Sequence, residues 1–166
     1  MVRLILLDSD GVLTDGRIQM SSDGEESRSF YVRDGLGIRM GQHAGLAFGI
    51  LSGRQSRVVA QRASELEIAE VHQGVLNKAD CFRDVVRRLE IPPEAVCFVG
   101  DDLIDVPAMR LAGFAAAPAD AASEAREVAH YVTDREGGRG AVREVVDLVL
   151  RASGSWDSAV KHCFPA

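Results

Sequence analysis

The chain has 166 residues, of which 46% are hydrophobic and 27% are charged, and its formal net charge is −6. A chain of this length buries roughly 70% of its unfolded surface on folding, which excludes a disordered or fibrous protein and favours one globular domain. The acidic balance argues against broad binding to nucleic acid or anionic membranes, because both need a surplus of Lys and Arg along one face.

The N-terminal segment has four consecutive apolar residues, Leu4 to Leu7, before Asp8 interrupts the run. This run is too short for a secretory signal or a membrane-spanning helix, so we expect a cytoplasmic protein. The cysteines suit the reducing conditions of that compartment, because they are odd in number and have no zinc-like spacing. They are Cys81, Cys97 and Cys163.

Short apolar runs that end at Asp, Ser, Gly or Pro predict strands buried on both faces. The clearest runs are residues 4–7, 47–51, 96–99 and 114–117, and weaker ones are residues 70–72 and 130–132. Apolar residues at helical spacing predict helices around residues 58–66, 82–89 and 142–149. Strands that alternate with helices predict an α/β fold, a Rossmann-like parallel sheet with helices on both faces.

The segment from about residue 17 to residue 32 departs from this alternation. Ile18 and Met20 alternate with polar neighbours, and the pair Asp23-Gly24 is typical of a tight turn. Phe30 and Val32 then resume the alternation. We therefore predict a small β-hairpin inserted after the first strand, too short to serve as a cap domain.

Acidic residues gather after two of the predicted strands. The first strand ends in Asp8-Ser9-Asp10-Gly11, and the run at residues 96–99 is followed by Gly100-Asp101-Asp102-Leu103-Ile104-Asp105. The carboxyl ends of parallel strands meet at one edge of a sheet, so five carboxylates are expected to lie close together. Such a concentration of negative charge needs a cation, and oxygen ligands favour Mg²⁺.

Phosphate-binding groups follow other strands. The strand at residues 47–51 is followed by Ser52-Gly53-Arg54, which offers a hydroxyl and backbone amides, and Lys78 opens a predicted helix. A metal, a hydroxyl, amides and an ammonium group around a reactive carboxylate predict a phosphoryl-transfer site.

Four ordered motifs resemble those of the haloacid dehalogenase superfamily. They are Asp8-x-Asp10-Gly11-Val12-Leu13-Thr14-Asp15-Gly16, Ser52-Gly53-Arg54, Lys78, and Gly100-Asp101-Asp102-x-x-Asp105. Accessory motifs resemble those of the capless 3-deoxy-D-manno-octulosonate 8-phosphate phosphatases, and the resemblance runs from residue 4 to about residue 150. These motifs are Val32-Arg33-Asp34-Gly35-x-Gly37-Ile38, Gln73-Gly74-x-x-Asn77-Lys78 and Gly137-Gly138-Arg139-Gly140-Ala141-Val142-Arg143-Glu144.

The resemblance implies an Mg²⁺-dependent phosphatase that works through an aspartyl-phosphate intermediate. Asp8 is the implied nucleophile, and Asp10 is the implied general acid and base. The implied metal ligands are Asp8, the backbone carbonyl of Asp10, and Asp101, with Asp102 and Asp105 behind them. The implied phosphate ligands are Ser52, Gly53 and Lys78.

The implied substrate is the sugar-acid phosphate 3-deoxy-D-manno-octulosonate 8-phosphate, in lipopolysaccharide biosynthesis. Two alternatives stay open: a nine-carbon sialic-acid-type phosphate, and an inactive tetramer-forming module like the domain attached to acylneuraminate cytidylyltransferases. Intact Asp8, Asp10 and Lys78 favour an active enzyme. Candidate ligands of the substrate carboxylate are Arg33, Arg54 and Arg139, because a guanidinium group matches a carboxylate bidentately.

The resemblance also implies a homotetramer that forms through the hairpins, so that each site is covered by a neighbouring subunit. We expect residues 1–152 to form a single phosphatase domain and residues 153–166 to form a C-terminal tail. Gly154 suits a left-handed helix cap, and the segment from Ser155 to Ala166 has too little apolar periodicity to extend the core. In the resembling phosphatases this tail reaches a neighbouring site, so we expect a mobile end that acts there as a lid.

Some polar residues are interpreted as structural when they are considered alone. Asp15 and Asp34 are expected to stabilise a turn or to cap a helix. The histidines share no motif and show no helical pairing, so we expect them to be structural or surface residues. They are His43, His72, His130 and His162.

Overall fold

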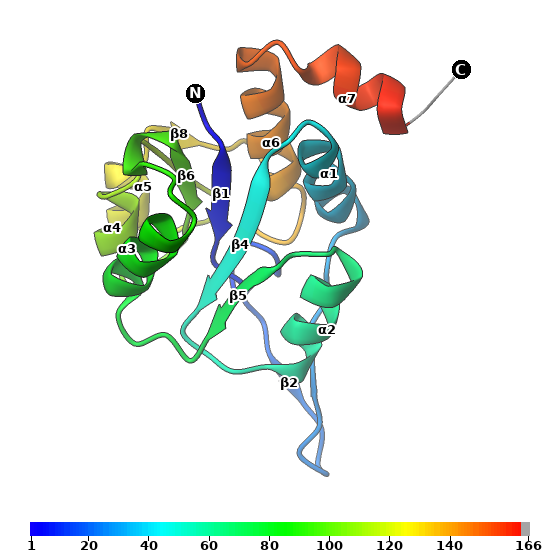
Figure 1. Cartoon of the computed structure of the whole chain (residues 1–166). Helices are drawn as coiled ribbons and strands as arrows, with labels where there is room; N and C mark the ends of the chain where they lie inside the picture. The colour runs from blue at the N-terminus through cyan, green and yellow to red at the C-terminus, as the bar shows by residue number, and fades with distance from the viewer. Residues whose placement is uncertain (164–166) are drawn as a thin grey trace.

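The computed structural model describes residues 1–163, and its centre is a six-stranded parallel sheet in the order β5-β4-β1-β6-β7-β8 (Figure 1). The strands are β1 (Leu4–Leu7), β4 (Ala47–Ser52), β5 (Glu70–Gln73), β6 (Val96–Val99), β7 (Phe114–Ala117) and β8 (Tyr131–Val132). All six predicted strands are present, including the two weaker ones. The predicted α/β fold is therefore confirmed.

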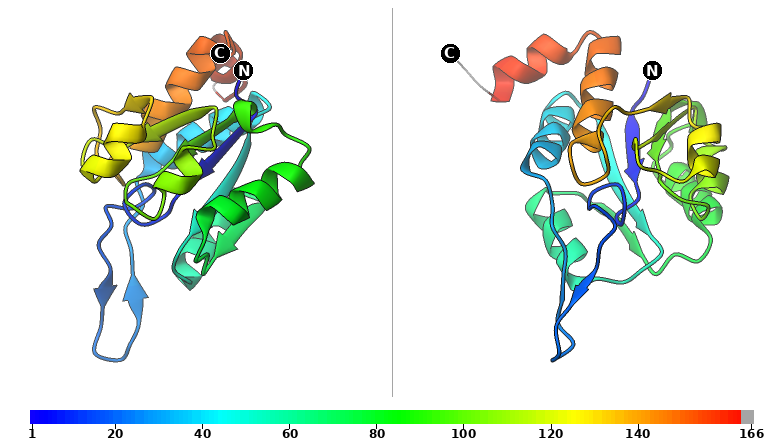
Figure 2. Two further views of the ribbon diagram at one scale, coloured as in Figure 1. Left: turned by 90° about the vertical axis from the view of Figure 1, so that its left-hand side faces the viewer. Right: turned by 180° about the vertical axis from the view of Figure 1, so that it is seen from behind.

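Helices cover both faces of the sheet (Figure 2). One face carries α1 (Val32–His43), α2 (Arg57–Glu65), α6 (Ala141–Ala152) and α7 (Trp156–Cys163). The other carries α3 (Lys78–Arg88), α4 (Val106–Met109) and α5 (Ser123–Val128), and a short 3₁₀ helix spans Pro93–Ala95. Among residues 1–163, no helix is long and apolar enough to cross a membrane.

Strand β1 joins the two hydrophobic cores at the centre of the sheet. Ile5 and Leu7 point into the core under α1, α2 and α6, whereas Leu4 and Leu6 point into the core under α3, α4 and α5. All four side chains are fully buried, as the uninterrupted apolar run predicts for a strand covered on both faces. This packing fixes the position of the loop that follows β1.

Helix α1 was not predicted, and it replaces the expected end of the hairpin. The alternation of Phe30 and Val32 was interpreted as strand, but Val32 is the first residue of α1. Glycines at positions 35, 37 and 41 weaken any helical signal in the sequence. The structure shows why α1 contains glycine: a Cβ atom on Gly37 would lie 2.9 Å from Cδ of Arg143 on α6. Close packing of α1 on α6 thus outweighs the low helix propensity.

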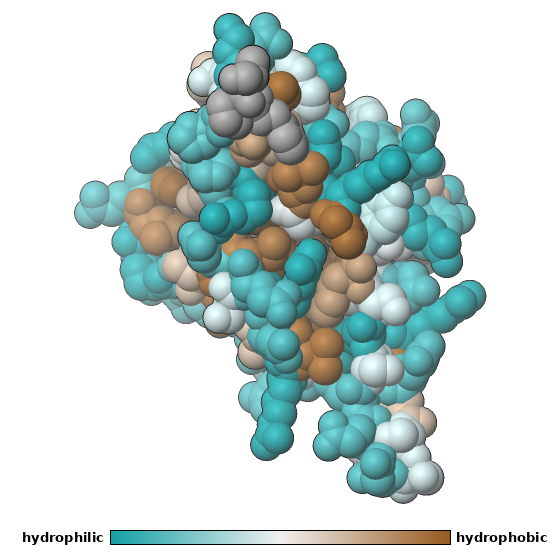
Figure 3. All heavy atoms as spheres, turned by 90° about the vertical axis from the view of Figure 1, so that its right-hand side faces the viewer, coloured by the Kyte–Doolittle hydropathy of each residue, from teal (hydrophilic) through white to brown (hydrophobic). Residues whose placement is uncertain are grey.

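The predicted hairpin is shorter than expected and projects away from the body (Figure 2). It consists of β2 (Gln19–Met20) and β3 (Glu26–Ser27), which pair antiparallel, and Gly24 in the turn has a φ of +85°. An isolated two-stranded hairpin is at best marginally stable in water. The projection at the lower right of Figure 3 is this hairpin, seen from the side of α1 and α2.

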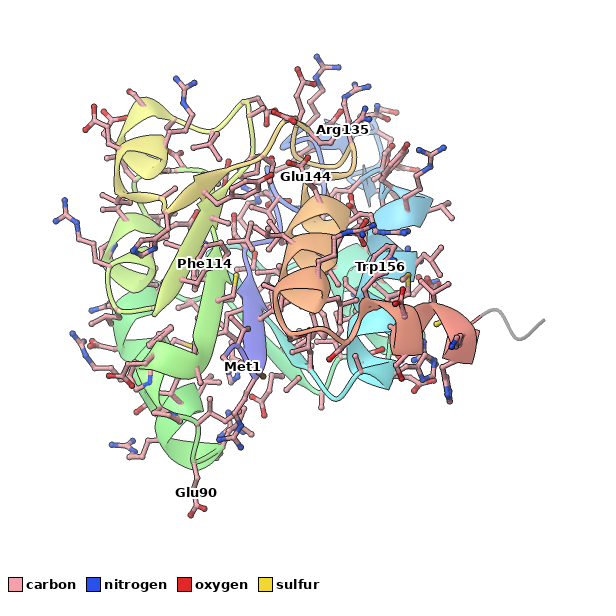
Figure 4. The ribbon with its side chains drawn as sticks, turned by 90° about the horizontal axis from the view of Figure 1, so that it is seen from above. Met1, Glu90, Phe114, Arg135, Glu144 and Trp156 are labelled. Atoms are coloured by element: carbon pink, nitrogen blue, oxygen red, sulfur yellow. The ribbon has the colours of Figure 1, made fainter. Side chains whose placement is uncertain are left out.

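The C-terminal segment is more ordered than its composition indicates. Helix α6 ends at Ala152 and Gly154 has a φ of +72°, as expected. The prediction that the segment from Ser155 lies outside the core is wrong for α7, where Ala159 is only 2% exposed. Trp156 lies beside α6 (Figure 4), and the Arg151 guanidinium is 4.0 Å from its ring centroid.

Helix α7 does not cover the site of its own subunit, and its contact with a neighbouring subunit's site stays a prediction. This helix lies at the top of Figure 1, at the end of the sheet opposite the hairpin and the carboxyl ends of the strands. The last three positions of the expected tail, residues 164–166, lie outside the described residues.

Candidate active site

The site residues lie where the chain order of the sheet reverses. β4 and β6 flank β1, so the segments that follow these three strands meet at one edge. Parallel α/β sheets bind ligands at such a point, because the strand ends and helix N-termini converge there. Asp8 follows β1, Ser52 ends β4, and Asp101 follows β6.

The loop after β1 folds back tightly over Asp8. Leu13 N and Thr14 N donate hydrogen bonds to Ser9 O at 3.0 and 3.1 Å, and Gly11 has a φ of +98°. A Cβ atom on Gly11 would lie 2.0 Å from Oδ2 of Asp101. Glycine therefore meets two requirements at this position: the left-handed backbone and the close approach of the loop to Asp101.

Lys78 joins two carboxylates from the segments that follow β1 and β6. Its Nζ donates hydrogen bonds to Oδ1 of Asp8, at 2.6 Å, and to Oδ1 of Asp105. The Asn77 side chain accepts from Asp80 N at 3.2 Å, which caps α3 and fixes the first turn from which Lys78 extends. Burial alone would lower the pKa of Lys78, but the attraction of Asp8 and Asp105 outweighs it and raises that pKa. Lys78 is thus held as a buried cation.

Asp8, Asp101 and Asp105 form a carboxylate cluster in which one oxygen from each residue lies within 4.8 Å of the others. Burial, followed by repulsion from Asp105, raises the pKa of Asp8 to about 6. Burial and repulsion from Asp8 and Asp105 raise the pKa of Asp101 to about 8. Oδ1 of Asp101 is buried and has no hydrogen-bond partner among the described residues. A buried oxygen without a donor, beside two other carboxylates, fits a divalent cation.

Asp105 has two functions in this cluster. Its Oδ1 pairs with Lys78, and its Oδ2 accepts hydrogen bonds from the backbone N of Asp101 and Asp102 at 3.0 and 3.2 Å. Asp102 was predicted to lie behind the metal together with Asp105, but its side chain is exposed and accepts from Leu103 N at 2.7 Å. Asp105 therefore lies closer to the other carboxylates than Asp102 does.

The Asp10 side chain contacts a residue that the sequence interpretation did not single out. Nε and Nη2 of Arg28, which follows β3, lie 2.7 and 3.3 Å from the two carboxylate oxygens of Asp10. The two residues are 18 positions apart and lie on different elements, so no local spacing connects them. The available signal was that Arg28 is a lone cation on a hairpin arm that also carries Asp23, Glu25 and Glu26.

The other predicted anion ligands lie beside the cluster. Leu7 pairs with Ile50 across β1 and β4, which places Ser52 next to the segment that follows Asp8. The Ser52 side chain is almost completely buried, and its Oγ accepts from Arg54 N at 3.4 Å. Gly53 follows at the rim and is partly exposed.

The three predicted carboxylate-binding arginines do not converge. Arg54 is exposed next to Ser52, whereas Arg33 and Arg139 line a separate cleft of about 450 Å³. Among residues 1–163, the lining of that cleft includes none of the carboxylates of the cluster. Glu144, which also lines it, accepts a hydrogen bond from Arg135 N at 3.1 Å (Figure 4). Of these three arginines, Arg54 is the one that lies just after a strand, β4, that leads into the site.

Comparison with known proteins identifies the same superfamily that the sequence motifs resemble. Residues 38–113 match the haloacid dehalogenase-like hydrolase family. The chain is 48% identical to the 3-deoxy-D-manno-octulosonate 8-phosphate phosphatase KdsC of Escherichia coli K12 over 158 residues, which cover 95% of this chain and 84% of that protein. The chain belongs to the KdsC phosphatase family. KdsC of Yersinia pestis is 42% identical over the same coverage.

Solved structures share the fold of this KdsC-family chain. The phosphatase of Moraxella catarrhalis, crystallised with magnesium, phosphate and KDO, has a TM-score of 0.95 at 37% identity and covers 98% of this chain and 94% of its own. The cobalt-bound enzyme of Haemophilus influenzae has a TM-score of 0.90 at 36% identity, with coverages of 93% and 91%. The fold is therefore that of the KdsC phosphatases.

Proposed function

We propose that this protein is an Mg²⁺-dependent phosphatase that hydrolyses 3-deoxy-D-manno-octulosonate 8-phosphate to the free sugar acid and phosphate. The observation that carries the proposal is the buried Asp8–Lys78 pair beside the Asp101 and Asp105 carboxylates. The activity named for the relatives and the ligands named for the Moraxella catarrhalis structure support the substrate class.

The reaction has two displacements. In the first, a carboxylate oxygen of Asp8 forms a bond to phosphorus, and the bond from phosphorus to the sugar oxygen breaks as that oxygen takes a proton from Asp10. In the second, water gives a proton to Asp10 and attacks phosphorus, which breaks the bond to Asp8 and releases phosphate. Asp10 thus ends each cycle in its starting protonation state.

The carboxylate cluster is the proposed metal site. Asp8, the backbone carbonyl of Asp10 and Asp101 would hold Mg²⁺, with Asp105 behind them. The bound ion would offset the charge repulsion between the Asp8 carboxylate and the phosphate group. Oδ1 of Asp101, which has no hydrogen-bond partner within residues 1–163, supports this assignment, because a buried carboxylate oxygen is costly without a donor or a cation.

Ser52, Gly53 and Lys78 are the proposed ligands of the phosphate oxygens. The Ser52 hydroxyl and the Gly53 amide would donate hydrogen bonds, and the Lys78 ammonium would balance the charge that develops in the transition state. Lys78 also keeps Asp8 in place through their 2.6 Å contact. Arg54 is the proposed ligand of the sugar carboxylate within this subunit. Arg33 and Arg139 are also candidates for this role, but they line a separate cleft.

A homotetramer that forms through the hairpins is also proposed, in the cytoplasm. Large apolar side chains are exposed on the hairpin and just after it: Met20 of β2 is 68% exposed, and Val32, the first residue of α1, is 79% exposed. Others are exposed around the site, where Leu76 is 92% exposed and Leu103 60%. Because isolated hairpins are marginal and the site has no cap, contact between these two apolar surfaces in different copies would stabilise both.

A phosphate-release screen tests the proposed function. The purified protein with Mg²⁺ is given eight-carbon and nine-carbon sugar-acid phosphates and p-nitrophenyl phosphate, and kcat/KM is measured for each. The proposal predicts the highest kcat/KM for 3-deoxy-D-manno-octulosonate 8-phosphate. A preference for the nine-carbon compound would change the substrate, and no phosphate release from any compound would favour the inactive regulatory module.

A further inference from the structure

The side chain of Arg28 is enclosed between the hairpin and the body of the protein, although the residue as a whole is partly exposed. Its side chain has no exposed surface, and it makes four polar contacts with three different residues. Two contacts go to Asp10, at 2.7 Å from Nε and 3.3 Å from Nη2. The others run from Nη1 to Glu26 Oε1 at 2.6 Å and to Ser56 Oγ at 2.7 Å.

Ser56, which contacts Nη1 of Arg28, is itself held in place by α2 and by the sheet. Ser56 is the N-cap of α2, and its Oγ accepts a hydrogen bond from Val59 N. The backbone N of Ser56 donates to Oε1 of Gln73, the last residue of β5, at 2.6 Å. The guanidinium group is planar and rigid, so the contacts at Nη1 also fix the positions of Nε and Nη2. Arg28 therefore links the orientation of Asp10 to α2 and β5.

Charge alone does not account for this arrangement. The Arg28 guanidinium is shared by the carboxylates of Asp10 and Glu26, so its single positive charge is divided between two anions. A surface ion pair that attaches a hairpin is usually exposed and makes one contact, and such pairs contribute little to the stability of the fold. Complete burial, a two-point contact and a second anchor are features of a group that fixes the direction of its partner.

We propose that Arg28 is a positioning residue that directs the Asp10 carboxyl group at the oxygen of the departing sugar; this inference rests on the proposed phosphatase function. The short contact holds Oδ1 of Asp10. Oδ2, at 3.3 Å, keeps a free lone pair that can carry the proton. When the bond from phosphorus to the sugar oxygen breaks, that oxygen receives the proton from Asp10. Asp10 is then a carboxylate that accepts hydrogen bonds from Arg28.

The leaving group of the substrate separates this function from a structural one. A sugar alkoxide is a poor leaving group and needs the proton from Asp10, whereas p-nitrophenolate departs without one. The value of kcat/KM covers the steps up to formation of the aspartyl-phosphate, so it is independent of the later base function of Asp10. A misdirected Asp10 should therefore affect the sugar phosphate selectively.

The test compares wild type, Arg28→Gln, Arg28→Lys and Asp10→Asn on the sugar-acid phosphate, phenyl phosphate and p-nitrophenyl phosphate with Mg²⁺. Arg28→Gln should lower kcat/KM for the sugar phosphate by about 30- to 100-fold and for p-nitrophenyl phosphate by less than about threefold. Phenyl phosphate should lie between them. Arg28→Lys keeps the charge but not the planar guanidinium group, so its losses in kcat/KM should follow the same order of substrates but be smaller. The losses in Asp10→Asn should follow that order and be larger.

Arg87→Gln is the matched control, because Arg87 is an exposed residue of α3 whose contact is with Asp84. It should leave all three kcat/KM values unchanged. Equal losses on all three substrates in Arg28→Gln, or no loss on any, would overturn the positioning function. If thermal melting shows that Arg28→Gln is unfolded, Arg28→Lys decides by the same criterion. A wild-type protein that releases no phosphate would instead refute the proposed function.

Discussion

The Asp34 carboxylate on α1 accepts a hydrogen bond from the backbone N of Arg143 on α6, at 2.8 Å. It also accepts one from Gly140 N at 3.3 Å, so it caps a helix that begins more than one hundred residues later. Gly140 has a φ of +113° and offers no side chain for this purpose. Asp34 is thus a helix-cap residue, as expected, but the helix that it caps is α6.

Asp34→Asn should remove a pH dependence of stability. Burial raises the pKa of Asp34 from 3.8 to about 6 in the folded state, so the folded protein holds its proton more tightly than the unfolded chain. This group therefore adds stability as pH falls from about 6 to about 4. The free energy of unfolding of wild type relative to Asp34→Asn should be greater at pH 4.5 than at pH 7.5, by about 2 kcal/mol. Urea denaturation at both pH values measures it, and a constant difference would contradict it.

Lys78→Met should destabilise the fold and abolish turnover. Loss of the ammonium leaves Asp8 and Asp105 buried without a cation, which should lower the free energy of unfolding by about 3–5 kcal/mol without Mg²⁺. In the double variant Lys78→Met/Asp105→Asn, one of these charges is also removed. We expect that variant to recover about half of the lost stability but none of the activity. If the double variant were less stable than Lys78→Met, repulsion between the two carboxylates would not be the cause.

Asp8→Asn should reduce phosphate release by more than about 1,000-fold, because an amide cannot replace the carboxylate as nucleophile. The fold should persist, since the amide oxygen can still accept the hydrogen bond from Lys78. Asp84→Asn, at an exposed position of α3, is the matched control and should retain full activity. Near wild-type turnover by Asp8→Asn at the same Mg²⁺ concentration would exclude the aspartyl-phosphate mechanism.

Chelation should remove activity, and Mg²⁺ should restore it, whereas Ca²⁺, which prefers looser coordination, should restore little. Binding should also raise the melting temperature, because the ion stabilises the folded state by about 2.7 kcal/mol at one hundred times its dissociation constant. Asp101→Asn should reduce this rise, since Asp101 provides the unpartnered oxygen of the cluster. Full activity after chelation, or an unchanged Mg²⁺-dependent rise in Asp101→Asn, would refute the metal site.

Met20→Glu should dissociate the proposed tetramer, because it places a charge on the exposed apolar face of β2. The dissociated subunit should remain folded and melt cooperatively, since Met20 belongs to neither hydrophobic core among residues 1–163. Gln19→Glu adds the same charge to the opposite face of β2 and is the control. Light scattering after gel filtration measures the mass, and equal masses for both variants would argue against assembly through this face.

The sequence alone was sufficient for the sheet and for the place of the site. Apolar runs such as Leu4–Leu7 have one favourable environment, a strand buried on both faces, and parallel strands bring the residues that follow them to one edge. This local rule predicted all six strands and the meeting of Asp8 with Asp101. The repeated pattern of acid, hydroxyl and lysine after successive strands also indicated the family.

The tertiary structure decided those features that depend on contacts between distant segments. Helix α1 forms because its glycines allow close packing on α6, and α7 is ordered because Ala159 is buried in the core; neither contact is visible in local periodicity. The pairing of Arg28 with Asp10 and of Asp34 with Arg143 joins residues that only the closed fold brings within hydrogen-bond distance. Burial in that fold, rather than the identity of the residues, raises the pKa values of Asp8 and Asp101.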